Sequence, residues 1–343
     1  MLKHILIFVF AGFILHSCQN AQRNDANPDF ASSISIVDVY KELHNIKSAD
    51  EWKSFYEAHP EFSKLYFENI LSLDTTQGSS GFYQSWQQAS RDSGFIALGN
   101  KVLKVFPNTD FLKRDFEKLF KEMQTHFPEI KMPTFYTLIS DFTYQVFIFE
   151  DKNKQDGVGI SLDMFLGDAI DYKMVAPDNT NFSNYFTRSW NKDHITRKVA
   201  NLYIDEFVGT PSGYKMLDIM LNHGKSLYIA EKFLPEANDT IIMEFSESQL
   251  DWCKNNELPM WSFFLDNNLF YESSQSKIGK YINPSPNSPG MPTEAPGRTG
   301  DYIGWQIIRA YMKRYPETTL SDLIKMNDSQ TILEKSKYKP KQK

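Results

Sequence analysis

The fold is decided by residues 110–167, DFLKRDFEKLFKEMQTHFPEIKMPTFYTLISDFTYQVFIFEDKNKQDGVGISLDMFLG, where one strong helical pattern precedes three short strand patterns. In the first part, apolar residues recur three and four positions apart, with lysines and glutamates between them: Phe111, Leu112, Phe116, Leu119, Phe120 and Met123. This period predicts an amphipathic helix, which Asp110 can cap and Pro128 ends.

Three β-rich stretches follow this helix, at residues 134–139, 144–149 and 157–166. They are joined by polar segments at residues 140–141 and 151–156, which favour turns. Because the stretches are short and consecutive, we expect a small antiparallel meander.

Helical patterns lie on both sides of these strands. They cover residues 37–71 before the sheet and residues 195–208 and 213–233 after it. A further helix opens at Ser246, where Gln249 three places on completes a capping-box pattern. The order of helices, a small sheet and helices predicts an α+β fold that is predominantly helical.

The composition supports one large folded body, for which one domain or two intimately packed halves both fit, and we place it at residues 31–335 as a single globular domain. Of the 343 residues, 41% are hydrophobic and 15% aromatic, which excludes disorder for the body. The net charge of −6 argues against a nucleic-acid partner. Residues 336–343 form a basic tail, which is either a solvated terminus or a contact for anionic headgroups or an acidic partner.

The start of the chain has the pattern of a bacterial lipoprotein signal, with Lys3, an apolar run at residues 5–15, and Ser17 directly before Cys18. We predict that residues 1–17 are a signal peptide, that Cys18 is acylated, and that residues 18–30 are a flexible tether. An ordinary secretory signal and an uncleaved membrane helix are the alternatives, but the apolar run is too short to span a bilayer.

Lipid anchoring at Cys18 predicts a protein that sits on the cell membrane or the outer membrane without crossing it. The tether carries no run of acidic residues, which favours a body in the periplasm. The second cysteine, Cys253, follows Trp252 in a helical pattern, so we expect a buried structural thiol.

Residues 273–300 form a long interruption rich in proline and glycine, for which we expect no regular structure. It is either a functional covering lid or a rigid, proline-braced connection. The chain leaves it at residues 296–311 through a glycine-punctuated start of an amphipathic helix, which Thr299 or Asp301 can cap.

Catalytic and metal-binding motifs are absent from the sequence, including His-Glu-x-x-His, Cys-x-x-Cys and Gly-x-Ser-x-Gly. None of the seven histidines forms a close ligand pair, and we expect His194 and His223 to be surface or satisfied helix residues. We therefore predict no cofactor and no metal.

The chain resembles the gliding-motility lipoprotein GldB family of Bacteroidota. The resemblance is carried by residues 126–128 (HFP), 159–167 (GISLDMFLG), 223–228 (HGKSLY), 252–257 (WCKNNE), 296–300 (PGRTG), 304–311 (GWQIIRAY) and 335–340 (KSKYKP). It implies an anchored envelope protein that is required for gliding, is linked to the type IX secretion machinery and has no known catalysed reaction. It also implies a layout similar to zinc-peptidase-like (zincin-like) proteins, although residues 201–206 hold no histidine pair.

Two hypotheses follow. In the first, the protein is a noncatalytic component that binds other gliding or secretion proteins of the envelope through the face near residues 273–305. Its candidate residues, for partner contact or for structure, are Arg298, Asp301, Trp305, Lys225 and Tyr228. In the second, it is a peptidase-like or glycan-active enzyme with an unorthodox site drawn from Asp163, Asp171, Glu206 and Glu257.

Overall fold

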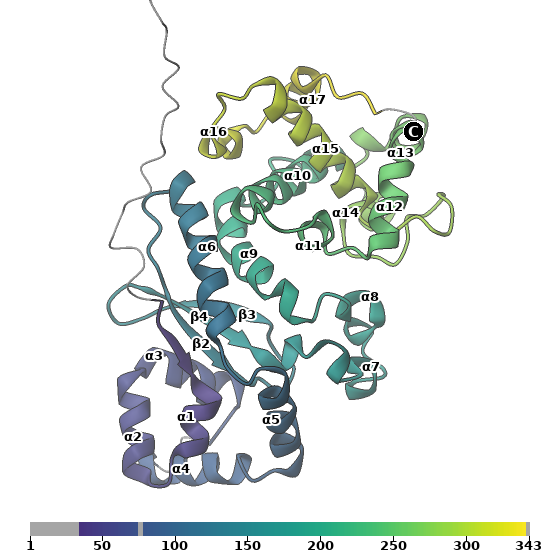
Figure 1. The fold of residues 1–343 in the computed structure, drawn as a ribbon. Coiled ribbons are helices and arrows are strands. Elements are labelled where there is room, and N and C mark those ends of the chain that lie inside the picture. Colours follow the sequence, from purple (N-terminus) through teal and green to yellow (C-terminus); the bar gives the residue numbers. More distant parts are fainter. Residues whose placement is uncertain (1–33, 75–77, 341–343) are drawn as a thin grey trace, which may run out of the picture. The chain divides into compact units, whose positions relative to one another are not determined.

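A four-stranded mixed sheet organises the computed structural model, which describes residues 34–74 and 78–340. The strands are β1 (Ile36–Asp38), β2 (Thr134–Leu138), β3 (Val146–Glu150) and β4 (Asp156–Ser161), in the order β1-β2-β4-β3 (Figure 1). The predicted signal peptide, Cys18 and the tether to residue 30 lie outside the described residues. Helices make up most of the rest, so the α+β, predominantly helical prediction is confirmed.

The predicted antiparallel meander is wrong in its pairing. Strands β1, β2 and β4 run parallel, and only β3 and β4 form an antiparallel pair. Strand β4 lies between β2 and β3, because the segment after β2 turns away instead of forming a hairpin. Asp163 holds that segment by accepting the backbone N–H groups of Ser140 and Phe142 at 3.1 and 2.7 Å. The strand predicted at residues 157–166 is also too long. Strand β4 ends at Ser161, and the next residues form the 3₁₀ turn η3 (Leu162–Phe165).

Two glycines in β4 determine how the aromatic rings of β3 pack. A Cβ atom added to Gly157 or Gly159 would lie within 2.2 Å of the rings of Phe149 and Phe147. The missing side chains therefore leave room for both rings to lie across the neighbouring strand.

The N-terminal helices cover this aromatic face of the sheet. They are α1 (Val39–Asn45), α2 (Ala49–Ala58), α3 (Pro60–Ser63), the π-helix η2 (Lys64–Ile70), α4 (Gly78–Ala89) and α5 (Ser93–Val105). Phe62 stacks on Tyr136 of β2 with ring centroids 4.3 Å apart, and the Tyr66 hydroxyl donates to the Ile139 carbonyl at 2.9 Å. Residues 36–38 form a strand, so the helical prediction for residues 37–71 is wrong at its start.

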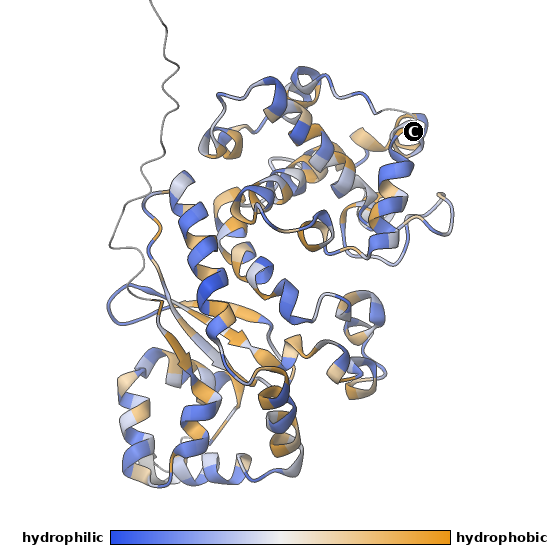
Figure 2. Ribbon diagram, viewed as in Figure 1, coloured by the Kyte–Doolittle hydropathy of each residue, from blue (hydrophilic) through white to orange (hydrophobic). Residues whose placement is uncertain are grey.

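Helices α6 (Asp110–His126) and α9 (Ile195–Val208) lie on the opposite face (Figure 1). Phe116 of α6 stacks on Phe135 of β2 at 4.2 Å, as the helical spacing requires. In Figure 2 the strands are mostly hydrophobic, whereas α6 is largely hydrophilic outside its buried stripe. Asp110 does not cap α6: the cap position is Thr109, and Asp110 is the first helical residue.

The C-terminal half is built around α10 (Met216–Phe233) and α15 (Thr299–Arg314), which cross at two glycines. A Cβ atom on Gly304 would lie 1.9 Å from the Met220 carbonyl oxygen, and one on Gly224 would lie 2.5 Å from the Gly304 carbonyl carbon. The two backbones are therefore in direct contact. Around them lie α11 (Asp239–Met243), α12 (Glu247–Asn255), α13 (Glu257–Asp266), α14 (Gln275–Ile282), α16 (Leu320–Lys325) and α17 (Ser329–Ser336).

Shorter elements complete the chain between β4 and the C-terminal helices. They are η4 (Gly167–Ala169), α7 (Tyr172–Val175), η5 (Thr180–Phe182), α8 (Asn184–Thr187) and η6 (Lys192–His194), and one further turn, η7 (Leu269–Tyr271), joins α13 to α14. The capping box predicted at Ser246 is confirmed, since its hydroxyl accepts the Gln249 N–H while the Gln249 side chain accepts the Ser246 N–H.

The proline-rich segment at residues 273–300 is held together by hydrogen bonds among its own residues. It contains the helix α14, so the expectation that it lacks regular structure is wrong. The buried Ser288 hydroxyl lies 2.6 Å from the Pro296 carbonyl and 2.7 Å from the Thr299 hydroxyl, and the Tyr281 hydroxyl donates to the Pro289 carbonyl at 2.5 Å. These contacts favour the braced connection over a lid.

Neither Thr299 nor Asp301 caps α15. Arg298 occupies the cap position in a left-handed conformation (φ 61°), and both other residues lie inside the first turn. Asp301 instead accepts a hydrogen bond from the Arg298 side chain at 2.8 Å.

The chain stays packed beyond residue 335. Ser336 is buried, and the Tyr338 hydroxyl donates to Glu257 Oε1 at 2.7 Å while its ring contacts Trp261. Lys335, Lys337 and Lys339 are exposed. Cys253 is fully buried, as predicted, and burial raises the pKa of its thiol. Within residues 34–74 and 78–340, no helix has both the length and the apolarity needed to cross a membrane.

Candidate functional site

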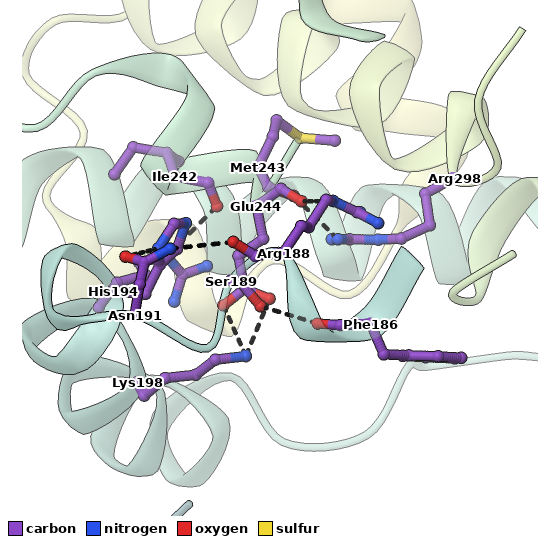
Figure 3. Close-up of polar contacts among 11 residues, drawn as sticks. Phe186, Arg188, Ser189, Asn191, His194, Lys198, Ile242, Met243, Glu244 and Arg298 are labelled. Carbon is purple, nitrogen blue, oxygen red and sulfur yellow. Dashed lines mark hydrogen bonds and ion pairs between the residues drawn. The ribbon is translucent and has the colours of Figure 1, made fainter. Parts of the chain in front are cut away.

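Three successive carbonyl groups at the end of α11 each accept a hydrogen bond from a different arginine. Arg197 Nε donates to the Ile242 oxygen at 3.2 Å. Figure 3 shows the other two, Arg298 Nη1 to the Met243 oxygen at 2.9 Å and Arg188 Nε to the Glu244 oxygen at 2.9 Å. The last carbonyls of a helix have no partner inside the helix and carry its negative dipole end, so cations are stabilised there.

Glu244 is the carboxylate at the centre of this cluster. It ends α11 in a left-handed conformation (φ 53°), and both of its carboxylate oxygens lie within 2.9 Å of Lys198 Nζ. Burial alone would raise the pKa of Glu244, but Lys198, Arg197 and Arg298 lower it to about 2. The carboxylate is therefore ionised at neutral pH and holds the basic groups together.

Arg298 connects this cluster to α10. Its Nε donates to Asp301 Oδ2 at 2.8 Å, and the other oxygen of the almost fully buried Asp301 lies 2.8 Å from His223 Nδ1. Burial lowers the pKa of His223, but the Asp301 carboxylate raises it by a larger amount. The pKa of His223 therefore lies above its ordinary value. Two helices are thus tied to the end of α11 through one carboxylate.

An open cavity of about 460 Å³ lies beside this cluster. Its charged lining consists of three cations and one carboxylate: Arg188, Lys198, Arg298 and Glu244. Apart from Met164 and Pro284, the rest of the wall is aromatic or carries amides and hydroxyls, and it includes Gln145, Asn179, Asn181, Phe182, Tyr185 and Trp190. We call this cavity the cationic pocket. Its fixed positive groups suit the binding of an anion.

Of the five residues named for the binding hypothesis, only Arg298 lines the cationic pocket, and Asp301 lies behind it. Trp305 is fully buried, with its indole N–H 3.2 Å from Glu231 Oε2 and the Arg309 guanidinium 3.6 Å from its ring centre. A partner therefore has no direct access to its ring.

Lys225 and Tyr228 lie on α10, away from the pocket wall. The Lys225 ammonium is buried and donates to the carbonyls of Met326 and Ile324, and burial lowers its pKa. Tyr228 is half-buried, with Lys232 Nζ 4.7 Å from its ring centre. Lys225 thus fastens the segment after α16 to α10.

The four acids of the enzyme hypothesis occupy separate positions. Asp163 is buried and accepts two backbone N–H groups, and Asp171 caps α7 by accepting the Lys173 N–H. Glu206 is exposed on α9, and Glu257 accepts the Tyr338 hydroxyl. Nowhere in the described ranges do three or more histidine, cysteine or acidic side chains form a group that could hold a metal ion.

Sequence reasoning did not find Arg188, Lys198 or Glu244. Met243 and Arg298, which the cluster joins, stand 55 residues apart, and no local motif connects them. The adjacent basic pair Arg197 and Lys198 near the start of a helix was the only signal available. We expected His194 to lie at the surface or to have its hydrogen-bonding groups satisfied. Its Nδ1 lies 2.9 Å from the Asn191 side-chain oxygen.

Comparison with known families gives a match over almost the whole chain. The family model described as gliding motility protein GldB matches residues 19–340. No curated protein and no solved structure matches the chain.

Proposed function

The chain belongs to the GldB family of gliding motility proteins, and from this premise we propose that it is a noncatalytic, lipid-anchored binding component of the gliding apparatus. Its partners in this proposal are other envelope proteins of the gliding and type IX secretion machinery, not nucleic acid. The lipid is carried by Cys18, and the body faces the periplasm from the cell membrane or the outer membrane.

The observation that supports a binding role is the way the charges of the cationic pocket are held. Each of its cations donates to a backbone carbonyl or pairs with a carboxylate, which fixes its position before any ligand arrives. Fixed cations of this kind bind anionic groups with little loss of side-chain freedom. The only carboxylate of the wall, Glu244, is engaged with Lys198 and is poorly placed to act as a general base.

The anchor is tested with the full chain expressed in a gliding strain from which the native gene has been deleted. We expect Cys18→Ser to move the protein out of the membrane fraction and to stop gliding, because a chain without acyl groups loses its stable attachment. Retention of the variant in the membrane fraction, with normal gliding, would contradict lipid anchoring at Cys18.

The contact face is tested at Arg298, which lines the pocket. We expect Arg298→Gln to stop gliding while the protein remains folded and abundant. Arg314→Gln is the matched control, because Arg314 is an exposed arginine at the other end of the same helix. Normal gliding of the Arg298→Gln strain would remove this face from the proposed role.

The absence of catalysis is tested on the full chain, purified in detergent without chelators, by its metal content and by cleavage assays on peptides and envelope polysaccharides. We expect no stoichiometric zinc and no cleavage, because the four candidate acids occupy separate positions. One equivalent of zinc per chain, with a peptide or polysaccharide cleavage that stops when a chelator removes the zinc, would contradict this proposal. The peptidase-like or glycan-active alternative would then replace it.

A further inference from the structure

Arg188 is the cation of the pocket whose charge is not matched by a carboxylate among the described residues. Its Nε donates to the Glu244 carbonyl and its Nη1 to the Tyr185 carbonyl. Its guanidinium carbon lies 4.0 Å from the centre of the Tyr185 ring. Because a guanidinium carries five N–H groups, others remain available to a ligand.

Two of the three cations in the pocket wall already have a carboxylate partner, so the third can take the anionic group of a ligand. Lys198 is paired with Glu244, and Arg298 is paired with Asp301. Among the residues that the structure describes, these pairs leave Arg188 as the wall cation without a carboxylate partner, half-exposed to the cavity. The planar guanidinium matches the two oxygens of a carboxylate.

The uncharged part of the wall suits a ligand in which this carboxylate is attached to a group that carries several hydroxyls. Gln145 and Asn181 offer amides that can donate to one hydroxyl group and accept from its neighbour, and Asn179, whose oxygen accepts the Asn181 backbone N–H at 3.0 Å, still offers its amide N–H groups. Phe182 and Tyr185 are half-exposed and offer flat apolar faces to C–H groups. The volume of about 460 Å³ lies in the range of small-ligand sites.

We propose that the cationic pocket binds an acidic sugar unit, with its carboxylate on Arg188 and its hydroxyl groups on the amides of Asn179, Asn181 and Gln145. Such units occur as repeating parts of acidic polysaccharides. The sugar is the ligand of the binding role proposed above, so this inference rests on that role. It adds the chemical class that the pocket recognises.

Binding is measured by calorimetry on the full chain in detergent micelles, with tri-galacturonic acid as the acidic probe and galactotriose as the neutral one. We expect binding of the acid only, because the neutral sugar leaves Arg188 unmatched. We expect Arg188→Gln to weaken binding by about tenfold or more, since it removes a charge-assisted hydrogen bond. Raising the salt concentration should weaken binding further.

Two variants keep this test sharp. Arg114→Gln removes an exposed arginine on α6 and should leave the affinity unchanged. Asn181→Ala removes an exposed amide of the wall and should also weaken binding, which keeps the test valid if Arg188→Gln lowers stability. All variants are checked for unaltered thermal unfolding.

Three results would overturn the assignment. Equal binding of the neutral and acidic sugars would remove the carboxylate contact. Binding that survives both Arg188→Gln and Asn181→Ala would place the sugar elsewhere. A glutamate-rich peptide that binds through Arg188 where the sugar does not would identify a protein ligand instead. The gliding assay is separate: an Arg298→Gln strain that glides removes this face from the proposed role, whereas a missing sugar interaction refutes only the ligand class.

Discussion

The contact between Gly224 and Gly304 predicts that Gly304→Ala destabilises the protein strongly. The added Cβ atom would lie 1.9 Å from the Met220 carbonyl oxygen, whereas ordinary contacts begin at 3.4 Å. Helices α10 and α15 would therefore have to separate by about 1.5 Å at this point. Neither atom can rotate away, because the carbonyl oxygen belongs to the backbone of α10 and the position of the Cβ atom is fixed by the backbone of α15.

The expected magnitude follows from two opposing effects. Overpacking costs about 3 kcal/mol at the upper end of its usual range, which applies here because the clash is with backbone. Alanine is favoured over glycine inside a helix by about 1 kcal/mol. The free energy of unfolding should therefore fall by about 2 kcal/mol, measured by urea unfolding followed by circular dichroism.

Gly279→Ala is the matched control. Gly279 lies in α14, and the nearest atom to an added Cβ is the Asn283 side-chain nitrogen at 3.8 Å. This variant should be as stable as the wild type or gain up to about 1 kcal/mol. Equal stability of the two variants would refute the close backbone contact between α10 and α15.

Three further predictions concern buried polar groups. Glu244→Gln should cost about 3 kcal/mol at pH 7, because the pKa of Glu244 is lowered from 4.5 to about 2 in the folded state. This stability is present above pH 4.5 and is lost as the pH falls toward 2. The difference in free energy of unfolding between the wild type and Glu244→Gln, measured with urea, should therefore be smaller at pH 3 than at pH 7. An equal difference at both pH values would contradict the ion pair. Asp163→Asn should cost about 1–3 kcal/mol in thermal unfolding at pH 8, because an amide has one acceptor oxygen for two backbone N–H groups, and an unchanged melting temperature would refute this role. Cys253 should resist thiol reagents in the folded protein and react fully in guanidinium, since it is fully buried and burial raises its pKa; rapid labelling of the folded chain would show that the thiol is accessible.

Local patterns in the sequence were sufficient where one segment determines its own structure. The spacing of Phe116 and Phe120 gave α6, and Ser246 with Gln249 gave the start of α12, because these contacts join residues at most four positions apart. The class of fold followed from the order of such segments. The buried Cys253 followed from its helical neighbourhood.

Only the tertiary structure decided how these segments combine. Strand β4 lies between β2 and β3, and Asp163 binds the backbone of the segment after β2, a contact between residues more than 20 positions apart. The charged wall of the cationic pocket likewise joins segments far apart in the sequence, because Arg188 and Arg298 both donate to the last carbonyls of α11. The sequence alone therefore determined the strongly periodic helices, the class of fold and a family resemblance, whereas strand order and the pocket depend on long-range contacts, which no local period encodes.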